Sequence, residues 1–165
     1  RSRGLGDVYK RQGIDSLFAR CAEVGIDAII IPDLPFAEYM REYRPLCEKY
    51  GIDIIMLITP ETSPERIRLI DDNCSGFIYM VSAASTTGVR DSFSQEQKEY
   101  FDRIASMNLH HPRLIGFGIS NPATMADACA YSSGAIIGSL FIKCLERNPT
   151  PALAVTDLLH TIGRI

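Results

Sequence analysis

The sequence predicts an α/β fold, an incomplete (β/α)8 or TIM barrel of about five parallel strands, and three observations lead to it. First, five short apolar runs alternate with helical patterns, and unbroken apolarity is typical of parallel strands that are covered on both faces. Second, glycine turns follow the last two runs, whereas a dinucleotide-binding fold carries its glycines after the first strand. Third, no G-x-G-x-x-G motif follows any run, which disfavours the alternative, an open doubly wound sheet.

The length fits one domain but not a whole barrel of this kind. A (β/α)8 barrel takes about 250 residues and eight strands, whereas this chain has 165 residues. We therefore expect about three βα units to be missing from the front. Residues 1–12 show no apolar period and are interpreted as a non-native or disordered leader, and residues 13–165 as the partial barrel domain. Open strand edges and bare apolar faces predict that the chain alone is unstable.

The first elements have recognisable boundaries. Asp15 is expected to cap a first helix, because a carboxylate accepts hydrogen bonds from the free N–H groups of a first turn, and Gly25 ends it. A second helix spans residues 36–50, where apolar residues recur at spacings of four and three. Gly51 follows at the position where a left-handed residue commonly ends a helix. The five expected strands are residues 28–31, 54–58, 77–81, 114–117 and 135–137.

Helix starts in the second half carry N-cap signals. Ser94 and Gln97 form an S-x-x-Q capping box, in which each side chain bonds the other residue's backbone N–H. Proline is suited to the first helical position because its missing N–H would have no partner there. The last helix is expected to turn Val155, Leu158, Leu159 and Ile162 inward. Further helices are expected to start at Ser63-Pro64, Asn121-Pro122, Ser139 and Thr150-Pro151.

Composition excludes several classes of function. The net charge of −3 gives no basic field, so nucleic acid is not an expected partner. The longest unbroken apolar run, residues 54–58, is far too short to cross a bilayer, and we expect neither a membrane span nor a signal peptide. The cysteines lack a C-x-x-C pair, which argues against zinc and disulfides and predicts core filling in a reducing cytoplasm. They are Cys21, Cys47, Cys74, Cys129 and Cys144.

The two glycine turns near the C-terminus indicate an anion site. Residues 114–118 and 134–138 are apolar runs that each break at a glycine and then enter a helix. Glycine lets backbone N–H groups approach a ligand closely, and a helix N-terminus favours negative charge. In (β/α)8 barrels the loops after the last two strands commonly bind phosphate. The pair of turns therefore predicts a phosphate site.

Three segments together resemble a known family. They are Gly25–Pro35, which contains P-D-L-P, Gly116–Ser120, which reads G-F-G-I-S, and the turn Gly138-Ser139. In this order they are similar to the tryptophan synthase α subunit, from its fourth strand onward, and the resemblance covers residues 13–165. It implies a (β/α)8 barrel of which strands 4 to 8 are present.

The resemblance also implies an activity and a partner. The family is a lyase that cleaves indole-3-glycerol phosphate to indole and glyceraldehyde 3-phosphate in tryptophan biosynthesis. Its α subunit uses no cofactor or metal and assembles with a β subunit, which holds pyridoxal phosphate (PLP), into an α2β2 heterotetramer. The expected location is the cytoplasm.

Residue roles follow from matching positions in the resemblance. The substrate phosphate would be held by Gly88, Gly118, Gly138 and Ser139. The pocket and its lid would include Tyr79, Thr87 and Phe117, although Tyr79 could equally be a core tyrosine. Asp33 and Pro35 would face the β subunit, with turn chemistry as the alternative for Asp33.

The resemblance leaves the chemical step without its acids. The family's cleavage needs a glutamate and an aspartate near the second strand, one to move a proton at indole C3 and the other to hold charge at the indole nitrogen. Both belong to the part that this sequence lacks, so the chain is expected to contain no catalytic residue and to be inactive alone. Glu61 is interpreted as a solvated loop charge, and His110 and His111 as exposed residues on the opposite rim.

Two alternatives remain open at this point. One is another phosphate-binding barrel enzyme, such as an indole-glycerol-phosphate synthase or a ribose-phosphate isomerase relative. No lysine lies in any expected strand, which counts against the synthase. The other is a non-catalytic module that binds a phosphorylated ligand and a second protein.

Overall fold

The computed structural model describes residues 3–82 and 92–164, with side chains from Gly13 onward. The expected site residues Thr87 and Gly88 lie outside these ranges. The chain divides into two compact units, the first made of Arg1–Met56 and Asp72–Gly76 and the second of Leu57–Asp71 and Phe77–Ile165. Each unit is built from parallel strands and helices in the alternating order that the sequence predicts.

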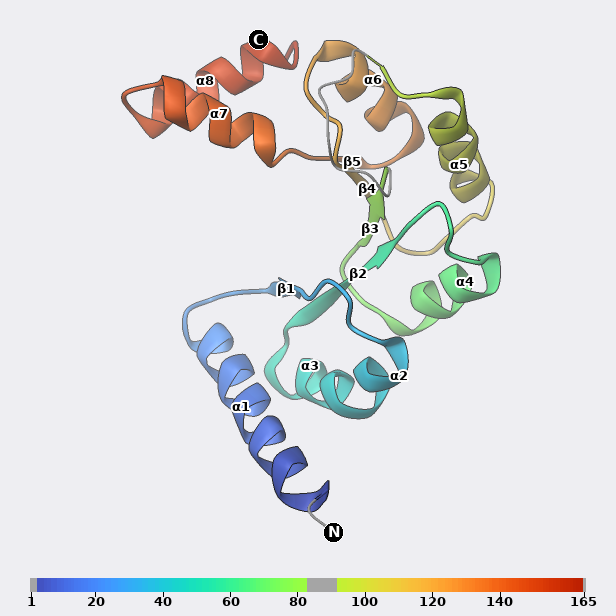
Figure 1. The fold of residues 1–165 in the computed structure, drawn as a ribbon, viewed down its shortest axis with the longest axis vertical. Coiled ribbons are helices and arrows are strands. Elements are labelled where there is room, and N and C mark those ends of the chain that lie inside the picture. Colours follow the sequence, from blue (N-terminus) through green and yellow to red (C-terminus); the bar gives the residue numbers. More distant parts are fainter. Residues whose placement is uncertain (1–2, 83–91, 165) are drawn as a thin grey trace. The chain divides into compact units, whose positions relative to one another are not determined.

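The first unit places helices around a short parallel pair of strands. Strand β1 pairs with β2 in the register Ala28–Asp53 to Ile30–Ile55. Rings of Tyr43 and Tyr50 lie against Phe18, which is fully buried, so α1 packs on α3 (Figure 1). The elements are α1 (Arg3–Glu23), β1 (Ala28–Ile30), α2 (Phe36–Glu38), the π-helix η1 (Tyr39–Tyr43), α3 (Arg44–Tyr50) and β2 (Asp53–Ile58), which continues into the second unit.

The predicted start of the first helix is wrong. Helix α1 begins at Arg3, so Asp15 lies inside it, where it accepts hydrogen bonds from Lys49 Nζ and Tyr50 Oη of α3 at 2.8 and 3.1 Å. An aspartate can therefore serve a contact between helices as well as a cap. The division into a leader of residues 1–12 and a domain of residues 13–165 stays a proposal.

The predicted helix 36–50 contains a π-helical turn. The Arg44 N–H bonds the carbonyl of Tyr39, five residues back, across η1. Pro45, in the first turn of α3, has no N–H to give to a carbonyl four residues back, and its ring would crowd that carbonyl. The wider turn relieves this conflict. The expected helix end is confirmed, since Gly51 is left-handed at φ 66°.

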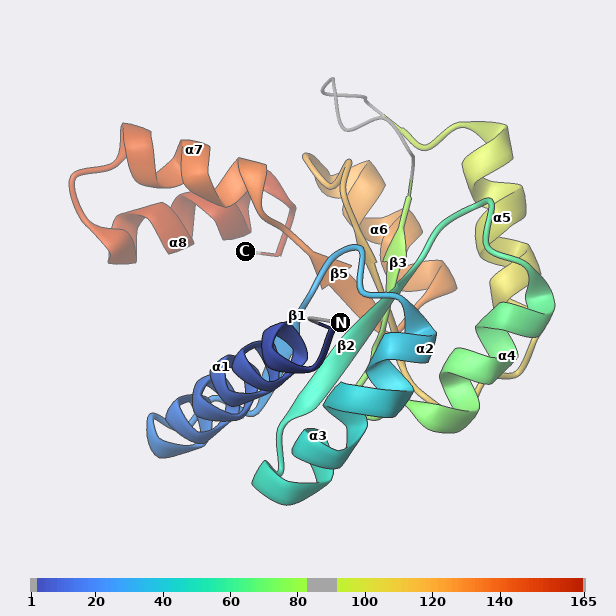
Figure 2. The same cartoon turned by 60° about the horizontal axis from the view of Figure 1, so that its bottom comes forward.

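The second unit contains three neighbouring parallel strands. Strand β3 pairs with β4 in the register Ile78–Arg113 to Val81–Gly116, and β4 pairs with β5 in the register Leu114–Gly134 to Gly116–Ile136. Helices α5 and α6 lie next to each other beside these strands (Figure 2). The elements are α4 (Pro64–Asn73), β3 (Ile78–Val81), α5 (Gln95–Ala105), β4 (Arg113–Gly116), α6 (Pro122–Tyr131), β5 (Gly134–Ile136), α7 (Ser139–Arg147) and α8 (Pro151–Thr161).

Side-chain caps begin the helices as the sequence predicts. The Ser94–Gln97 capping box is present at α5, and Asn121 caps α6 in a second box with Thr124. The hydroxyl of Thr150 accepts the Leu153 N–H at the start of α8. These caps satisfy N–H groups that the first helical turn leaves without backbone partners.

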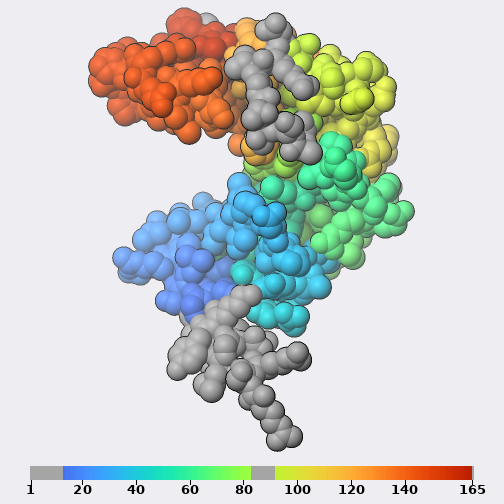
Figure 3. Space-filling view, in the orientation of Figure 1, coloured from blue at the N-terminus to red at the C-terminus, as the bar shows by residue number. Residues whose placement is uncertain are grey.

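The C-terminal hairpin departs from the expected inward pattern. Helices α7 and α8 run side by side (orange to red in Figure 3), and Arg147 pairs with Asp157 across them. Ile162 is buried as predicted, but Val155 is 45% exposed, so that prediction is wrong. Ala154, fully buried, takes the inward position instead. Other exposed apolar residues on the hairpin are Ile142, Leu145 and Leu153.

The predicted burial of the first strand and of the cysteines holds only in part. Ala28 and Ile30 of β1 are exposed, although their unbroken apolar run predicts cover on both faces. Cys21, Cys47 and Cys144 are buried and free, and burial raises the pKa of the Cys47 thiol to about 11. Cys74 is half-buried and Cys129 is exposed, so neither fills the core as expected.

Candidate functional site

The two glycine turns leave neighbouring strands at the same level. Gly116 of β4 pairs in register with Ile136 of β5, and the strands are parallel. Gly118 and Gly138 each follow two residues beyond this pair, so both lie past the carboxyl ends of their strands. This rim is where (β/α)8 barrels place ligands. Both glycines are exposed.

The turn after β4 has an unusual backbone. Phe117 and Gly118 have φ of 66° and 79°, and phenylalanine rarely adopts the left-handed region. The Ser82 hydroxyl donates a 2.8 Å hydrogen bond to the Phe117 carbonyl and holds this conformation. A Cβ on Gly118 would lie 3.4 Å from the Phe93 ring and 3.7 Å from the Ser82 hydroxyl. These are ordinary contacts, so the backbone angle, and not the space, is what favours glycine here.

The turn after β5 opens directly into a helix. Gly138 is the N-cap residue of α7 and Ser139 its first helical residue. Gly138 offers no side-chain cap, in contrast to the residues that cap α5, α6 and α8. A Cβ on Gly138 would meet nothing within 4 Å. This helix end therefore presents first-turn N–H groups and the positive dipole end to the same rim.

Tyr79 packs beside this rim rather than in open solvent. Its side chain lies on β3, and the residue is 8% exposed, with its ring 6.0 Å from that of Phe117. Burial raises the pKa of the phenol, so it stays neutral at physiological pH. Phe117 is 42% exposed. The exposed Phe117 ring thus lies next to the Gly118 turn and is backed by the buried Tyr79 ring.

Gly116 makes room for the Tyr79 hydroxyl. A Cβ at position 116 would lie 2.1 Å from the hydroxyl oxygen. Gly116→Ala is therefore expected to displace the Tyr79 ring and to lower the free energy of unfolding by about 1–3 kcal/mol, the usual cost of overpacking. Urea denaturation measures the loss. Gly134→Ala, whose Cβ would meet only a Leu114 methyl at 3.2 Å, is the milder control, and an equal loss in both variants would contradict this explanation.

Comparison with known proteins decides the family. The family model described as tryptophan synthase alpha chain matches residues 7–162. This chain belongs to the tryptophan synthase alpha chain family. It is 54% identical over 150 residues to the tryptophan synthase alpha chain of Parabacteroides distasonis and 56% identical over 147 residues to that of Phocaeicola vulgatus. These matches cover 91% and 89% of this chain but only 58% and 57% of the relatives.

A solved structure agrees on the fold. The tryptophan synthase complex of Pyrococcus furiosus contains a chain that matches with a TM-score of 0.78 at 22% identity, over 94% of this chain and 62% of that one. The expected fold class, an incomplete (β/α)8 barrel with five parallel strands, is confirmed for this alpha chain family member. Among its described residues, no helix is long and apolar enough to cross a membrane.

The two residues expected at the β-subunit interface lie in the first unit. Asp33 is exposed, in a turn, with φ of 55°, and Pro35 precedes the first residue of α2 as its N-cap. Aspartate tolerates the left-handed region better than most residues, so turn chemistry accounts for Asp33. Its role at an interface stays a prediction. Glu61 is exposed in a turn, as expected.

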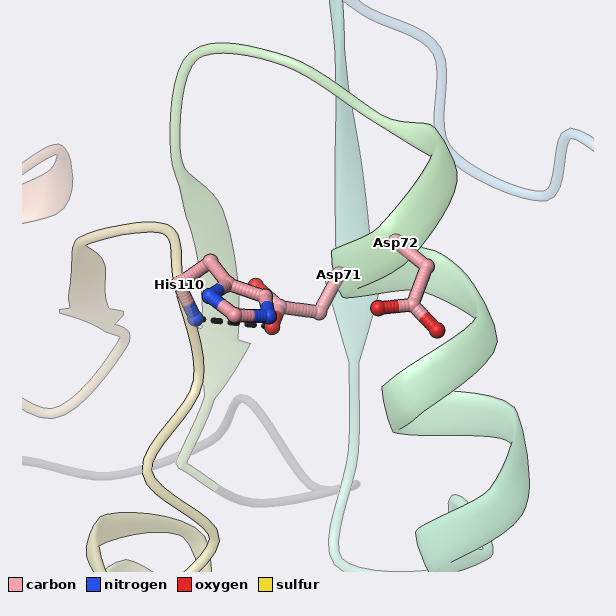
Figure 4. Close-up of side chains that lie close together, drawn as sticks. All are labelled: Asp71, Asp72 and His110. Carbon is pink, nitrogen blue, oxygen red and sulfur yellow. Dashed lines mark hydrogen bonds between the residues drawn. The ribbon is translucent and has the colours of Figure 1, made fainter.

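Asp71 is a structural carboxylate that sequence reasoning missed. It lies on α4, is 4% exposed, and accepts the His110 N–H at 2.7 Å (Figure 4). It also accepts the His111 N–H at 2.9 Å. The His111 ring nitrogen Nδ1 lies 3.1 Å from the same carboxylate. Burial opposes the charge on Asp71, but these hydrogen bonds outweigh it and lower its pKa.

The histidines therefore serve the fold at the opposite rim. His110 is exposed as predicted, but His111 is only half-exposed, because its ring faces Asp71. Both Asp71 oxygens accept donors from the chain itself. We accordingly assign no metal to this carboxylate. The sequence signal was an aspartate near the end of a helix, which does not reveal a partner about forty residues away.

Proposed function

We propose that this chain supplies the substrate-phosphate and pocket portion of a tryptophan synthase alpha chain, a lyase that cleaves indole-3-glycerol phosphate to indole and glyceraldehyde 3-phosphate. The observation that carries the proposal is the register of β4 and β5, in which Gly116 pairs with Ile136. The Gly118 and Gly138 turns therefore both begin two residues after this pair, at the carboxyl ends of the two strands. Family membership gives the reaction. The chain spans 58% of its Parabacteroides relative, so the activity belongs to the whole protein.

The phosphate is held by backbone groups in this proposal. The N–H groups around Gly118 and those of Gly138 and Ser139 point at the phosphoryl oxygens, with Gly88 contributing from the segment outside the described residues. Such groups need no side-chain charge, since oriented amides and a helix N-terminus favour an anion. A fixed phosphate orients the rest of the substrate and so reduces the entropic cost of reaction.

The Phe117 ring receives the indole end of the substrate. The exposed Phe117 ring offers apolar area beside the phosphate site, and the buried Tyr79 ring supports it from behind. Flat aromatic ligands pack favourably on such rings. The lid over the pocket is the role proposed for Thr87, which lies outside the described residues. Tyr79 stays neutral, because burial raises its pKa.

Proton transfer needs groups that this chain does not contain. A glutamate and an aspartate from the unmatched part of the protein act at indole C3 and at the indole nitrogen. The α subunit holds no cofactor, and indole passes to a β subunit that holds PLP. The partner is this β subunit in an α2β2 heterotetramer, with Asp33 and Pro35 at the contact, and the location is the cytoplasm.

Calorimetry with indole-propanol phosphate, a stable substrate analogue, tests the proposal. We expect the 165-residue chain to bind it without turning over indole-3-glycerol phosphate. Adding the missing front, with its glutamate and aspartate, should restore turnover. Absence of binding both with and without the front would reject the phosphate site, whereas binding without turnover after the front is restored would reject the lyase.

A further inference from the structure

We propose that Gln97, at the start of α5, is a positioning residue that fixes the Gly118 turn for phosphate binding. The inference rests on the proposed function, because the turn it holds is the proposed phosphate site. Among the described residues, Gln97 has no hydrogen bond to the turn itself. It acts through Ser82, the residue that follows β3.

The Gln97 side chain uses both ends of its amide. Its Oε1 accepts the Ser94 N–H at 2.8 Å as part of the capping box. Its Nε2 donates to the Ser82 carbonyl at 2.9 Å. A capping box needs only the acceptor, so glutamate would serve it equally well. The donor end is what distinguishes glutamine here, and it is directed at Ser82.

Ser82 connects Gln97 to the Gly118 turn. The residue is 1% exposed, and its hydroxyl donates to the Phe117 carbonyl at 2.8 Å. Its N–H bonds the Gly116 carbonyl at 3.2 Å. Ser82 is therefore bonded to the carbonyls of Gly116 and Phe117, which flank the Phe117 Cα. Phe117 has a positive φ.

The energetic logic favours a positioning role over simple stability. A left-handed phenylalanine is unfavourable and persists only where surrounding contacts fix it. The Ser82 hydroxyl supplies one such contact, and the Gln97 amide fixes the Ser82 peptide in turn. If the amide is lost, the Ser82 carbonyl loses a donor and the turn gains freedom. The N–H groups of the turn then bind phosphate less well, because they must be ordered on binding.

Gln97→Glu separates the two functions of the side chain. The carboxylate keeps the acceptor for Ser94 N–H and removes the donor to Ser82. Gln95→Glu is the matched control, since it places the same new charge in the same first turn. Gln95 is exposed, and among the described residues its side chain bonds only Glu99. We expect Gln97→Glu to weaken indole-propanol phosphate binding about 5- to 10-fold, and Gln95→Glu to leave it within about 2-fold.

Two readouts distinguish positioning from a structural role. Calorimetry on the folded protein measures the affinity for the analogue, and urea denaturation measures the free energy of unfolding. A purely structural role would change the free energy of unfolding and leave the affinity unchanged. The amide resonance of Gly118 in ligand-free protein should move in Gln97→Glu and stay in place in Gln95→Glu. Equal affinity in the wild type and Gln97→Glu, or an equal loss in both variants, would overturn the inference. A wild type that binds nothing would instead reject the proposed function, and the Gly118 resonance would still decide the inference.

Ser82→Ala provides a second route if Gln97→Glu does not fold. The variant keeps the Ser82 carbonyl that Gln97 bonds and removes only the hydroxyl that bonds Phe117. It should also move the Gly118 resonance and weaken analogue binding by a similar factor. A folded Ser82→Ala protein with wild-type affinity and an unshifted Gly118 resonance would show that Ser82 does not fix the turn, and it would overturn the inference.

Discussion

Gly118→Ala is expected to weaken binding of indole-propanol phosphate by at least about tenfold and to lower the free energy of unfolding by about 1–2 kcal/mol. The stability loss follows from φ of 79°, which a residue with a Cβ adopts at a cost. The affinity loss follows because the turn relaxes away from this backbone angle to relieve the strain, which shifts its N–H groups. The new methyl group itself would make only an ordinary contact, 3.4 Å from the Phe93 ring. Calorimetry and urea denaturation measure the two effects.

Gly51→Ala is the matched control for this variant. Gly51 has φ of 66°, and a methyl group at this position would meet nothing within 4 Å, so the variant carries the same backbone strain away from the proposed site. It should lose similar stability and keep the wild-type affinity. If both variants lost affinity equally, the effect of Gly118→Ala would be general destabilisation and would not support a phosphate site.

Asp71→Asn is expected to lower the free energy of unfolding by about 2–4 kcal/mol at neutral pH. The buried carboxylate accepts two backbone N–H groups and faces a histidine ring, and each backbone N–H requires an acceptor. An asparagine has only one acceptor oxygen, and its NH2 group would face a donor. Asp72→Asn removes the same charge from the neighbouring, exposed residue and should cost no more than about 0.5 kcal/mol.

The same contact predicts a pH dependence with a defined sign. The pKa of Asp71 is lower in the folded chain than its ordinary value of 3.8, so its stabilisation is present above that value and is lost as the pH falls through the folded pKa. The stability difference between the wild type and Asp71→Asn should therefore narrow between about pH 5 and pH 2. A difference that stays constant over this range would show that the carboxylate charge is not responsible.

Local signals made most of the fold predictable. The capping residues Ser94, Asn121 and Thr150 each bond N–H groups within three positions, so their partners are visible in the sequence. Gly51 ends its helix for the same local reason. The unbroken apolar runs identified all five strands to within one residue at each end. These features depend on near neighbours, which a sequence displays directly.

The features that the sequence did not reveal depend on distant neighbours. The π-helical turn before Pro45 is one way to accommodate a proline inside a helix, and the sequence alone does not select it. The left-handed backbone of Phe117 depends on Ser82, which lies 35 residues earlier. The glycine turns in the sequence predicted Gly118 and Gly138 as site residues. Only the register between β4 and β5 shows that the two glycines follow the same pair of residues.

The most direct test of the phosphate site is an NMR titration of the 15N-labelled chain with glycerol 3-phosphate, which carries the phosphoryl group without the indole. The amide resonances of Gly118, Gly138 and Ser139 should move together with one dissociation constant, while that of Gly51 should not move. Saturating ligand that leaves Gly118 and Gly138 unshifted, or shifts them with different dissociation constants, would contradict the claim that the two turns bind one phosphate.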